Sequence, residues 1–244
     1  MKLSIVVPSY DDAHELNGFL TSAAHVLSKQ KAEIIIQDGA SNTDVRSLAE
    51  DFKSKLNITY TAEPDEGIYD AILKGVEKSQ SDWILIMGSD DRLSTDITNL
   101  IEKLDDVCEI HYANVRFKNS GRIYDGPFSS KKLYLKNICQ QSVIYPKKAL
   151  NKLSEYRLDS MYCDYMLHIN LWSDPDYTWI FHDLVIADFD ESGVSSSIKE
   201  DYFYRHHRLL KEPLIEQANC SFLESALLRI INVLNMRWNQ LQRK

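Results

Sequence analysis

Two adjacent carboxylates, Asp90 and Asp91, follow Ser89 directly after an apolar run at 83–87. Mg²⁺ and Mn²⁺ prefer oxygen ligands and are commonly held by one or two protein carboxylates together with substrate phosphates. Two acids on one tight turn can divide this work, with one facing the metal and the other a ribose hydroxyl. The alternative is structural, because Asp-Asp before a helix caps free amide groups. Both interpretations stay open on the residues alone.

A second acidic stretch, Asp38 to Asp44, also follows an apolar run. At a strand end, Asp38 can accept a hydrogen bond from the N–H of a nucleotide base, and Gly39 lets a ligand approach the backbone closely. Ser41 and Asp44 are suited to capping the next helix, and we expect capping from Asp44. Asp38 is better placed than Asp44 for ligand contact.

The third stretch, Glu63 to Ala71, is typical of a turn that leads into a helix. Turns and first helical turns are often acidic without binding anything, so this composition alone does not require a ligand. That explanation does not cover Lys74, one turn later. Its ammonium group can face the phosphates of a bound nucleotide.

The elements that must position these residues alternate between strands and helices over the first hundred residues. Continuous β-branched runs are typical of strands buried on both faces, and apolar residues at helical spacing lie between them. We expect strands at 3–7, 33–37, 58–62 and 83–87, and helices at 13–29, 44–55 and 68–79. The pattern predicts an α/β fold, with helices covering both faces of a mostly parallel sheet.

Ligands of such sheets bind beyond the carboxyl ends of the strands, and here each of the four expected strands is followed by a carboxylate-bearing loop. Those loops carry the acids of 11–12, 38–44, 63–66 and 90–91. Carboxylates gathered at one edge of a sheet repel one another unless a cation lies between them. We therefore expect a divalent metal, Mn²⁺ or Mg²⁺, that holds a phosphorylated ligand.

The second half is less regular. A strand is expected at 111–118, a turn into a loop at 121–127, a helix at 159–172 and a strand at 178–188. From 202 onward the pattern is helical, and it ends in a stretch, 225–244, that has no acidic residue.

Composition excludes several classes of function. A formal net charge of −8 over 244 residues argues against a nucleic-acid binder. The four cysteines are far apart and form no CxxC pair, so reduced thiols in the cytoplasm are expected. No apolar run approaches about 18 residues, so we expect a soluble or peripheral protein. The missing GxGxxG and GxxxxGK[ST] loops count against dinucleotide dehydrogenases, P-loop NTPases and sugar nucleotidyltransferases.

Taken in order, five segments resemble the family 2 glycosyltransferases of the GT-A fold, especially those that build bacterial exopolysaccharide, capsule or lipopolysaccharide. The segments are SIVVPSYDDA, QDGASNTD, EPDEGIYDAILKG, WILIMGSDD and IADFDESGVSS. The resemblance covers residues 1 to 197. It implies a GT-A domain at 1–200, with a nucleotide-sugar-binding half at 1–95, an acceptor-binding half at 96–200, and a C-terminal helical extension at 201–244.

The resemblance also implies a role for individual residues. Asp38 would contact the base, expected to be uracil, Asp91 would coordinate the metal, and Asp164 would be the catalytic base that deprotonates the acceptor. One base and direct displacement would invert the anomeric centre. The remaining substrate-binding residues implied are Pro8, Tyr10 and Asp12 around the nucleotide, Gly39, Asp65 and Lys74 near the donor, and Ser89 and Asp90 beside ribose or sugar.

Asp164 also has a structural alternative, since an acid at a helix start caps the backbone. The sequence departs from the family pattern at Leu73, where asparagine is common, at Gln140-Gln141 in place of His-Gln, and at Ser192-Gly193 in place of Gly-Gly. The change at Gln140 bears on donor or acceptor recognition. It leaves room for a catalytically silent partner of an assembly complex as a second hypothesis, and another type of nucleotide-sugar enzyme is the third.

The expected partners are a nucleotide-sugar donor and a glycan or lipid-linked acceptor, with no nucleic acid. The acid-free stretch 225–244 carries apolar residues at helical spacing together with Arg229, Arg237, Arg243 and Lys244. Such a helix suits peripheral contact with the inner face of an anionic membrane. Packing on the domain or on another subunit of a homo-oligomer explains the same pattern.

Overall fold

The apolar runs of the first half form four neighbouring parallel strands. The computed structural model describes residues 2–27, 31–156, 160–190 and 202–242, with the backbone alone at 202–205, 208 and 237–242. The order across this part of the sheet is β3-β2-β1-β4. Their bounds are β1 Leu3–Ser9, β2 Ala32–Asp38, β3 Ile58–Ala62 and β4 Trp83–Ile86.

Alternate side chains of these strands enter two different cores because successive side chains point to opposite faces of a sheet. Leu3 and Ile5 of β1 pack with helices α1 (Ala13–Val26) and α2 (Val45–Phe52), whereas Val6 packs with helix α3 (Ile68–Lys78). All three side chains are fully buried. Burial on both faces explains why these strands are continuous apolar runs rather than alternating ones.

The second half extends the same sheet with strands of mixed direction. Beyond β4 the order is β8-β6-β9-β5, and β7 pairs with β6. Only the β6–β9 pair of this half is parallel among the described residues. The strands are β5 Arg92–Leu93, β6 Glu109–Phe117, β7 Ile123–Tyr124, β8 Val143–Pro146 and β9 Thr178–Phe189.

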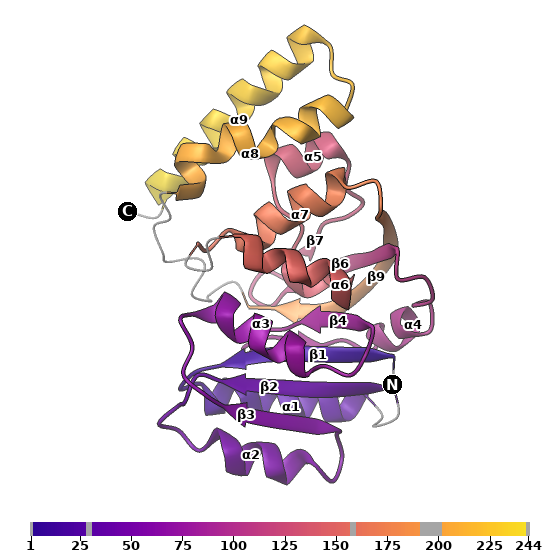
Figure 1. Ribbon diagram of the computed structural model, residues 1–244, viewed down its shortest axis with the longest axis vertical. Coiled ribbons are helices and arrows are strands. Elements are labelled where there is room, and N and C mark those ends of the chain that lie inside the picture. The colour runs from indigo at the N-terminus through magenta and orange to yellow at the C-terminus, as the bar shows by residue number, and fades with distance from the viewer. Residues whose placement is uncertain (1, 28–30, 157–159, 191–201, 243–244) are drawn as a thin grey trace.

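The remaining helices place the acceptor-side residues and the C-terminus. Helix α7 packs on α8, and α5 packs on both α8 and α9, so α8 and α9 form a helical hairpin at the end of the molecule opposite β3 (Figure 1). Within the described ranges, no helix combines the length and the apolar character that crossing a bilayer requires. The bounds are α4 Ile97–Ile101, α5 Ser130–Leu135, η1 Gln140–Ser142, α6 Lys147–Leu150, η2 Asn151–Glu155, α7 Cys163–Ser173, α8 Tyr202–Gln217 and α9 Phe222–Gln242.

The expected α/β fold is confirmed, and so is every strand and helix expected in the first half, with ends shifted by a few residues. Two expectations are corrected. The segment 121–127 contains a short strand, β7, where only a turn was expected. The helix expected at 159–172 begins at Cys163. Residues 157–159 lie outside the described part, as does 191–196 of the last family-like segment.

Gly75 offers a test of how closely α3 packs on the sheet. A Cβ atom at Gly75 would lie 2.5 Å from Cγ1 of the fully buried Val6. We expect Gly75→Ala to lower the free energy of unfolding by about 1–3 kcal/mol, as overpacked cores do. Denaturant unfolding measures it.

Gly18→Ala is the comparison variant, because its Cβ would meet the guanidinium end of Arg92, a long side chain that can rotate although it donates to the carbonyls of Ser89 and Asp91. In a helix, alanine is favoured over glycine by about 1 kcal/mol, which offsets the cost of moving this group, so the variant should lose less stability than Gly75→Ala. Equal destabilisation by both substitutions would contradict the close contact between Gly75 and Val6.

Candidate active site

The polar loops after the parallel strands lie at one edge of the sheet. In the parallel register Ser9 of β1 is paired with Asp38 of β2, and Asp38 with Ala62 of β3. The amide of Met87, directly after β4, donates to the Val6 carbonyl at 3.0 Å. The register therefore brings the acidic loops together, as the strand-end rule predicts.

Asp12 joins the first loop to the fourth. Its carboxylate accepts from the Ser9 hydroxyl at 2.5 Å and from the Ser89 hydroxyl. Ser89, which was expected beside the ribose or sugar, thus also holds an acid of another loop in place. Both hydroxyls orient Asp12 without neutralising its charge.

Asp38 is held by hydroxyl and amide donors. The amide and hydroxyl of Ser41 donate to Oδ1 at 3.0 and 2.5 Å, and the Tyr60 hydroxyl donates to Oδ2 at 2.7 Å. Burial, helped by the bond to Asp38, raises the pKa of Tyr60 to about 12, so this hydroxyl stays a donor. The carboxylate is oriented firmly, and its contact with a base stays a prediction.

Asp11 was missed as a structural residue of this edge. It adopts the left-handed region at φ 53°, which Asp tolerates better than most residues. Its carboxylate accepts from the amides of Asn42 and Thr43 at 2.7 and 3.3 Å. Asp11 therefore ties the first loop to the second. The sequence offered only an Asp-Asp pair, with no sign of which acid faces the loop.

Gly39 lies where two predicted ligand residues meet. A Cβ atom there would lie 2.6 Å from Oδ2 of Asp65 and 3.1 Å from Cδ2 of Tyr10. A side chain at this position would displace the Asp65 carboxylate. Tyr10 is 64% exposed beside Gly39. Pro8, two residues before Tyr10, is half-buried and pairs with Gln37 of β2. Tyr10, Gly39 and Asp65 are thus brought together.

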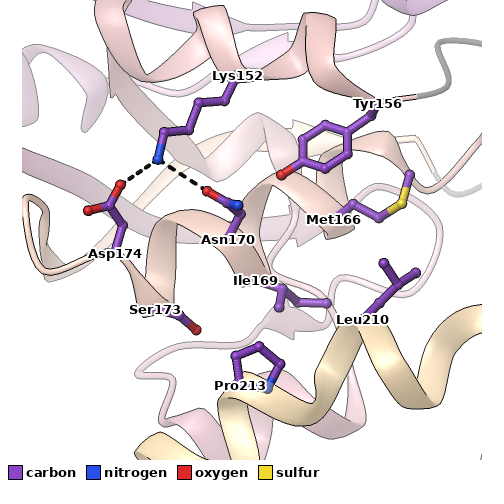
Figure 2. A pocket seen from close by; sticks show the side chains of 9 residues that line it. All are labelled: Lys152, Tyr156, Met166, Ile169, Asn170, Ser173, Asp174, Leu210 and Pro213. Carbon is purple, nitrogen blue, oxygen red and sulfur yellow. Dashed lines mark hydrogen bonds and ion pairs between the residues drawn. The ribbon is translucent and has the colours of Figure 1, made fainter.

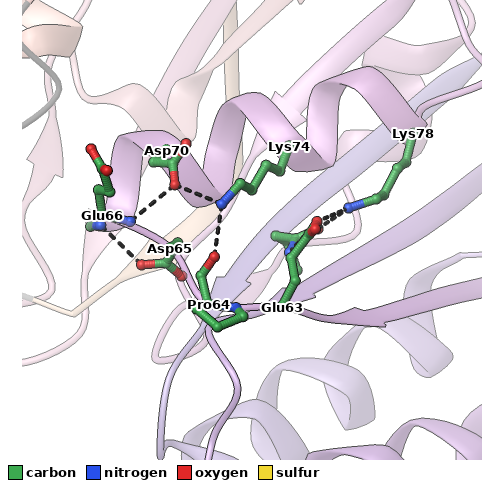
Figure 3. Close-up of polar contacts among 9 residues, drawn as sticks. Glu63, Pro64, Asp65, Glu66, Asp70, Lys74 and Lys78 are labelled. Carbon is green, nitrogen blue, oxygen red and sulfur yellow. Dashed lines mark hydrogen bonds and ion pairs between the residues drawn. The ribbon is translucent and has the colours of Figure 1, made fainter.

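Lys74 is bonded within its own loop and helix. Its ammonium donates to the Pro64 carbonyl and to Asp70, both at 2.8 Å, and Asp70 also accepts from the amide of Glu66 (Figure 3). The bond to Asp70 raises the pKa of Lys74. These contacts fix the loop after β3, and a role toward phosphate stays a prediction.

Asp44 has the capping role expected of it, because its carboxylate accepts from the amide of Ser47 at 3.0 Å at the start of α2. The capping alternative for Asp90 and Asp91 is wrong. The chain continues from Asp91 into strand β5, not into a helix.

Asp91 is the most deeply buried acid of the edge, with no exposed surface. Its two oxygens accept from the backbone amides of Gly88 at 3.1 Å and Asp190 at 2.9 Å. Burial, followed by the charge of Asp90, raises the pKa of Asp91 to about 7. Burial also raises the pKa of Asp90, with Asp190 and Asp12 adding to the effect.

Lys118 and Asp190 complete this cluster and were not predicted as site residues. The Lys118 ammonium donates to the Asp90 carbonyl and lies 3.5 Å from the Asp190 carboxylate. Asp190 lies in the family-like segment IADFDESGVSS, which was its only sequence signal. Lys118 had none.

The donor set suits a hard divalent cation. Asp12, Asp90, Asp91 and Asp190 offer oxygen atoms only, and their repulsion and burial raise two pKa values, which a cation would relieve. In the described part of the chain, no three His, Cys, Asp or Glu side chains converge as a complete metal site. Mg²⁺ and Mn²⁺ need only one or two protein carboxylates when substrate phosphates supply the rest.

Asp164 lies in the first turn of α7. Its Oδ1 accepts from the Tyr69 hydroxyl at 3.2 Å and its Oδ2 from the Asn137 amide at 2.7 Å. Burial raises the pKa of Asp164 to about 6, although these donors and the helix start act in the opposite direction. Its carboxylate oxygens accept from side chains of two other elements, which a cap alone does not require. A carboxyl with a pKa near neutrality is suited to accept a proton.

Segment 139–142 connects the two groups of acids. Burial, and to a smaller extent the charges of Asp91 and Asp164, raises the pKa of the Cys139 thiol. Both carboxylates therefore lie close enough to Cys139 to act electrostatically on its thiol. Next to it, the Gln140 amide nitrogen is buried and has no hydrogen-bond partner among the described residues. It is a donor available to a ligand.

A cavity of ≈ 380 Å³ lies between α7, η2 and α8 (Figure 2). Met166, Ile169 and Ser173 line it from one face of α7. At 100° per residue, Asp164 lies on the opposite face of that helix. The cavity is therefore not part of the candidate site.

The fold and the acids at its edge define a GT-A glycosyltransferase. Staphylococcus aureus TarS residues 1–349, in complex with UDP-GlcNAc, superposes with a TM-score of 0.70 at 17% identity, covering 97% of this chain and 72% of that one. The mannosyltransferase PcManGT from Pyrobaculum calidifontis, in complex with GDP-Man and Mn²⁺, superposes with a TM-score of 0.62 at 13% identity, covering 99% and 84%.

The chain belongs to glycosyl transferase family 2, whose model matches residues 4–163. A PGL/p-HBAD biosynthesis glycosyltransferase of Mycobacterium bovis (strain BCG / Pasteur 1173P2) is 25% identical over 211 residues, which cover 83% of this chain and 82% of that protein. A dolichol-phosphate mannosyltransferase of Pyrococcus furiosus is 23% identical over 159 residues, covering 64% and 44%.

Proposed function

We propose that this glycosyltransferase is an inverting enzyme that moves a sugar from a nucleotide-sugar, with a UDP-sugar as the expected donor, to a glycan or lipid-linked acceptor. Its role would be the synthesis of cell-surface polysaccharide at the cytoplasmic face of the membrane. One observation carries the proposal: the fully buried Asp91 and the half-buried Asp164, two carboxylates of raised pKa, both act on the pKa of the Cys139 thiol. One belongs to the strand-end cluster and the other to the acceptor half.

Donor binding is assigned to the first four loops. Asp38, which is held by Ser41 and Tyr60, would contact the base, and the exposed ring of Tyr10 beside Gly39 and Asp65 would offer a surface for it. Asp90 would contact ribose or sugar and Asp91 would hold the cation. A bound Mn²⁺ or Mg²⁺ would supply positive charge that stabilises the diphosphate leaving group.

Acceptor activation is assigned to Asp164. Its carboxylate takes the proton of the acceptor hydroxyl as that oxygen bonds to the anomeric carbon. The bond from the anomeric carbon to the phosphate oxygen breaks, and the nucleoside diphosphate leaves with the electron pair. A pKa of about 6 leaves most of this carboxyl ionised at neutral pH while it is still basic enough to help.

Asp164→Asn tests the assignment of the base. We expect kcat for sugar transfer to fall by about 10²–10⁴-fold, the usual contribution of a general base, with donor binding unchanged. Asp174→Asn, at the other end of α7, is the matched control, because Asp174 pairs with Lys152 away from the acids. Steady-state kinetics and calorimetric donor titration measure the two quantities. An active Asp164→Asn enzyme would rule out the base, and a parent protein that binds donor without turnover would favour the silent-partner hypothesis.

Cation binding should depend on pH through Asp91. The ionised carboxylate binds the cation, and with a pKa of about 7 it is mostly protonated at pH 6 and mostly ionised at pH 8. Apparent Mn²⁺ affinity should therefore rise roughly tenfold between these values. Electron paramagnetic resonance of free Mn²⁺ measures it. Asp91→Asn should bind weakly at both pH values; unchanged binding by this variant would place the cation elsewhere.

For the exposed face of α9 we propose contact with a second copy of the chain. Leu223, Leu227, Ile230 and Leu234 are each more than half exposed and follow the 4-3-4 spacing of a coiled-coil seam. Within 222–236 of α9, the two charged side chains pair with neighbouring helices: Glu224 with Lys131 and Arg229 with Glu212. That leaves this part of the seam apolar and poorly suited to anionic headgroups.

Sedimentation of a Leu227→Ser/Ile230→Ser variant tests this contact. The parent should sediment as a dimer and the variant as a monomer, because the seam loses its central apolar pair. Val107→Ser, at an exposed residue outside α9, should leave the dimer intact. A monomeric parent that pellets with phosphatidylglycerol vesicles would instead support the membrane alternative.

A further inference from the structure

Four side chains form one line of hydrogen bonds that ends on Asp164. The Asn137 amide nitrogen donates to Asp164 Oδ2 at 2.7 Å, and the Asn137 oxygen lies 2.7 Å from Nδ1 of His168. On the other side of the ring, His168 Nε2 lies 2.5 Å from the Tyr145 hydroxyl. Asp164 and His168 are four residues apart on α7, so Asn137 bridges two groups on one helix face.

The direction of every bond in this line is determined. An ionised Asp164 only accepts, so Asn137 turns its NH₂ group to the carboxylate and its oxygen to His168. Nδ1 of His168 must then carry the hydrogen. Burial lowers the pKa of His168 to about 3, so the ring is neutral and its Nε2 is an acceptor. Tyr145, whose pKa burial raises, supplies the hydroxyl donor.

We propose that Asn137, His168 and Tyr145 are positioning residues that hold the Asp164 carboxylate in one orientation toward the acceptor hydroxyl. The inference rests on the proposed function, in which Asp164 is the base. Asn137 comes from the segment before η1 and Tyr145 from β8, so the line also ties α7 to the sheet. Tyr69 of α3 holds the other carboxylate oxygen.

Neutral donors suit a base better than a cation would. The titratable groups whose pKa values respond to Asp164 are the hydroxyls of Tyr69, Tyr124, Tyr145 and Tyr165 and the thiol of Cys139, and burial raises the pKa of each. All are therefore uncharged at neutral pH. No lysine or arginine is among the largest influences on the pKa of Asp164. A neighbouring guanidinium would orient the carboxylate but would remove its basicity.

Two magnetic resonance measurements on the whole chain test the proposal without any substrate. In protein with ¹⁵N-labelled histidine, His168 should show the Nδ1–H tautomer, with His168→Gln identifying its signal. In protein with ¹³Cγ-labelled aspartate, Asp164 should titrate near pH 6, with Asp164→Asn identifying its signal. Asn137→Ala should raise this pKa by about one unit, because it removes a hydrogen bond to the charged form.

Tyr145→Phe carries the test even if Asn137→Ala fails to fold. Loss of the hydroxyl leaves Nε2 an unpaired acceptor, while the ionised Asp164 still fixes the direction of the other two bonds. We therefore expect the same Nδ1–H tautomer, a more weakly held Asn137 amide and a raised Asp164 pKa. Tyr165→Phe is the matched control, since Tyr165 on the same helix donates to the Leu133 carbonyl instead. It should change neither signal.

An Nε2–H tautomer in the parent, or an Asp164 pKa that is the same in the parent and in Tyr145→Phe, would overturn the proposal. If the network only stabilised the core, Tyr145→Phe would lower the melting temperature and leave the Asp164 pKa unchanged. The outcome is separate from that for the proposed function. Full activity of Asp164→Asn would contradict the assignment of Asp164 as the base, while the resonance data on the hydrogen bonds would stay valid. If Asp164→Asn is inactive but Tyr145→Phe does not change the Asp164 pKa, only the positioning role of Asn137, His168 and Tyr145 is refuted.

Discussion

The constraint on which the rest of the structure depends is the repulsion among carboxylates collected at one edge of the sheet. Asp12, Asp38 and Asp91 are all kept in place by neutral donors, namely serine and tyrosine hydroxyls and backbone amides. Neutral donors orient a carboxylate but leave its negative charge largely uncompensated, and burial makes that charge more costly. The pKa of Asp91 is raised to about 7, first by this burial and second by the charge of Asp90. We propose that a cation carried in with a phosphorylated ligand relieves this repulsion.

The topology explains how this cluster meets the acceptor half. Parallel strands β1, β2 and β4 end at the same edge, and β8 then pairs with β4 in the opposite direction. The antiparallel pairing brings the segment before β8, with Cys139 and Gln140, back to the edge where the acids lie. Helix α7 returns beside it and presents Asp164. The topology thus brings together the two groups of acids to which the proposed function assigns donor and acceptor roles.

Periodicity predicted the first half well because burial on both faces leaves long apolar runs, as in β1 and β2. In the second half, the long strands expected at 111–118 and 178–188 and the helix expected at 159–172 are also present, with shifted ends. Strands β5 and β7 were missed because each is two residues long, too short to show a periodic pattern.

The same contrast, between residues beside long periodic elements and residues outside them, distinguishes the site residues that were predicted from those that were missed. Asp90 and Asp91 follow a recognisable strand. Asn137 lies in a segment without a pattern, and Lys118 ends an expected strand that carried no sign of a site, so both gain meaning only from tertiary contacts. The acid pair at 90–91 was ambiguous locally, and only the strand that follows it excluded the helix cap.

The most direct test of the central claim is whether binding of a nucleotide-sugar to the folded protein requires a divalent cation. Thermal stability would be measured with UDP-, GDP- and dTDP-sugars, each with and without Mn²⁺ or Mg²⁺. We predict stabilisation by one nucleotide family, UDP by expectation, that appears only with the cation and is accompanied by slow release of the nucleoside diphosphate. Equal stabilisation with and without the cation, or none by any of these donors, would contradict a site built on the repulsion of its acids.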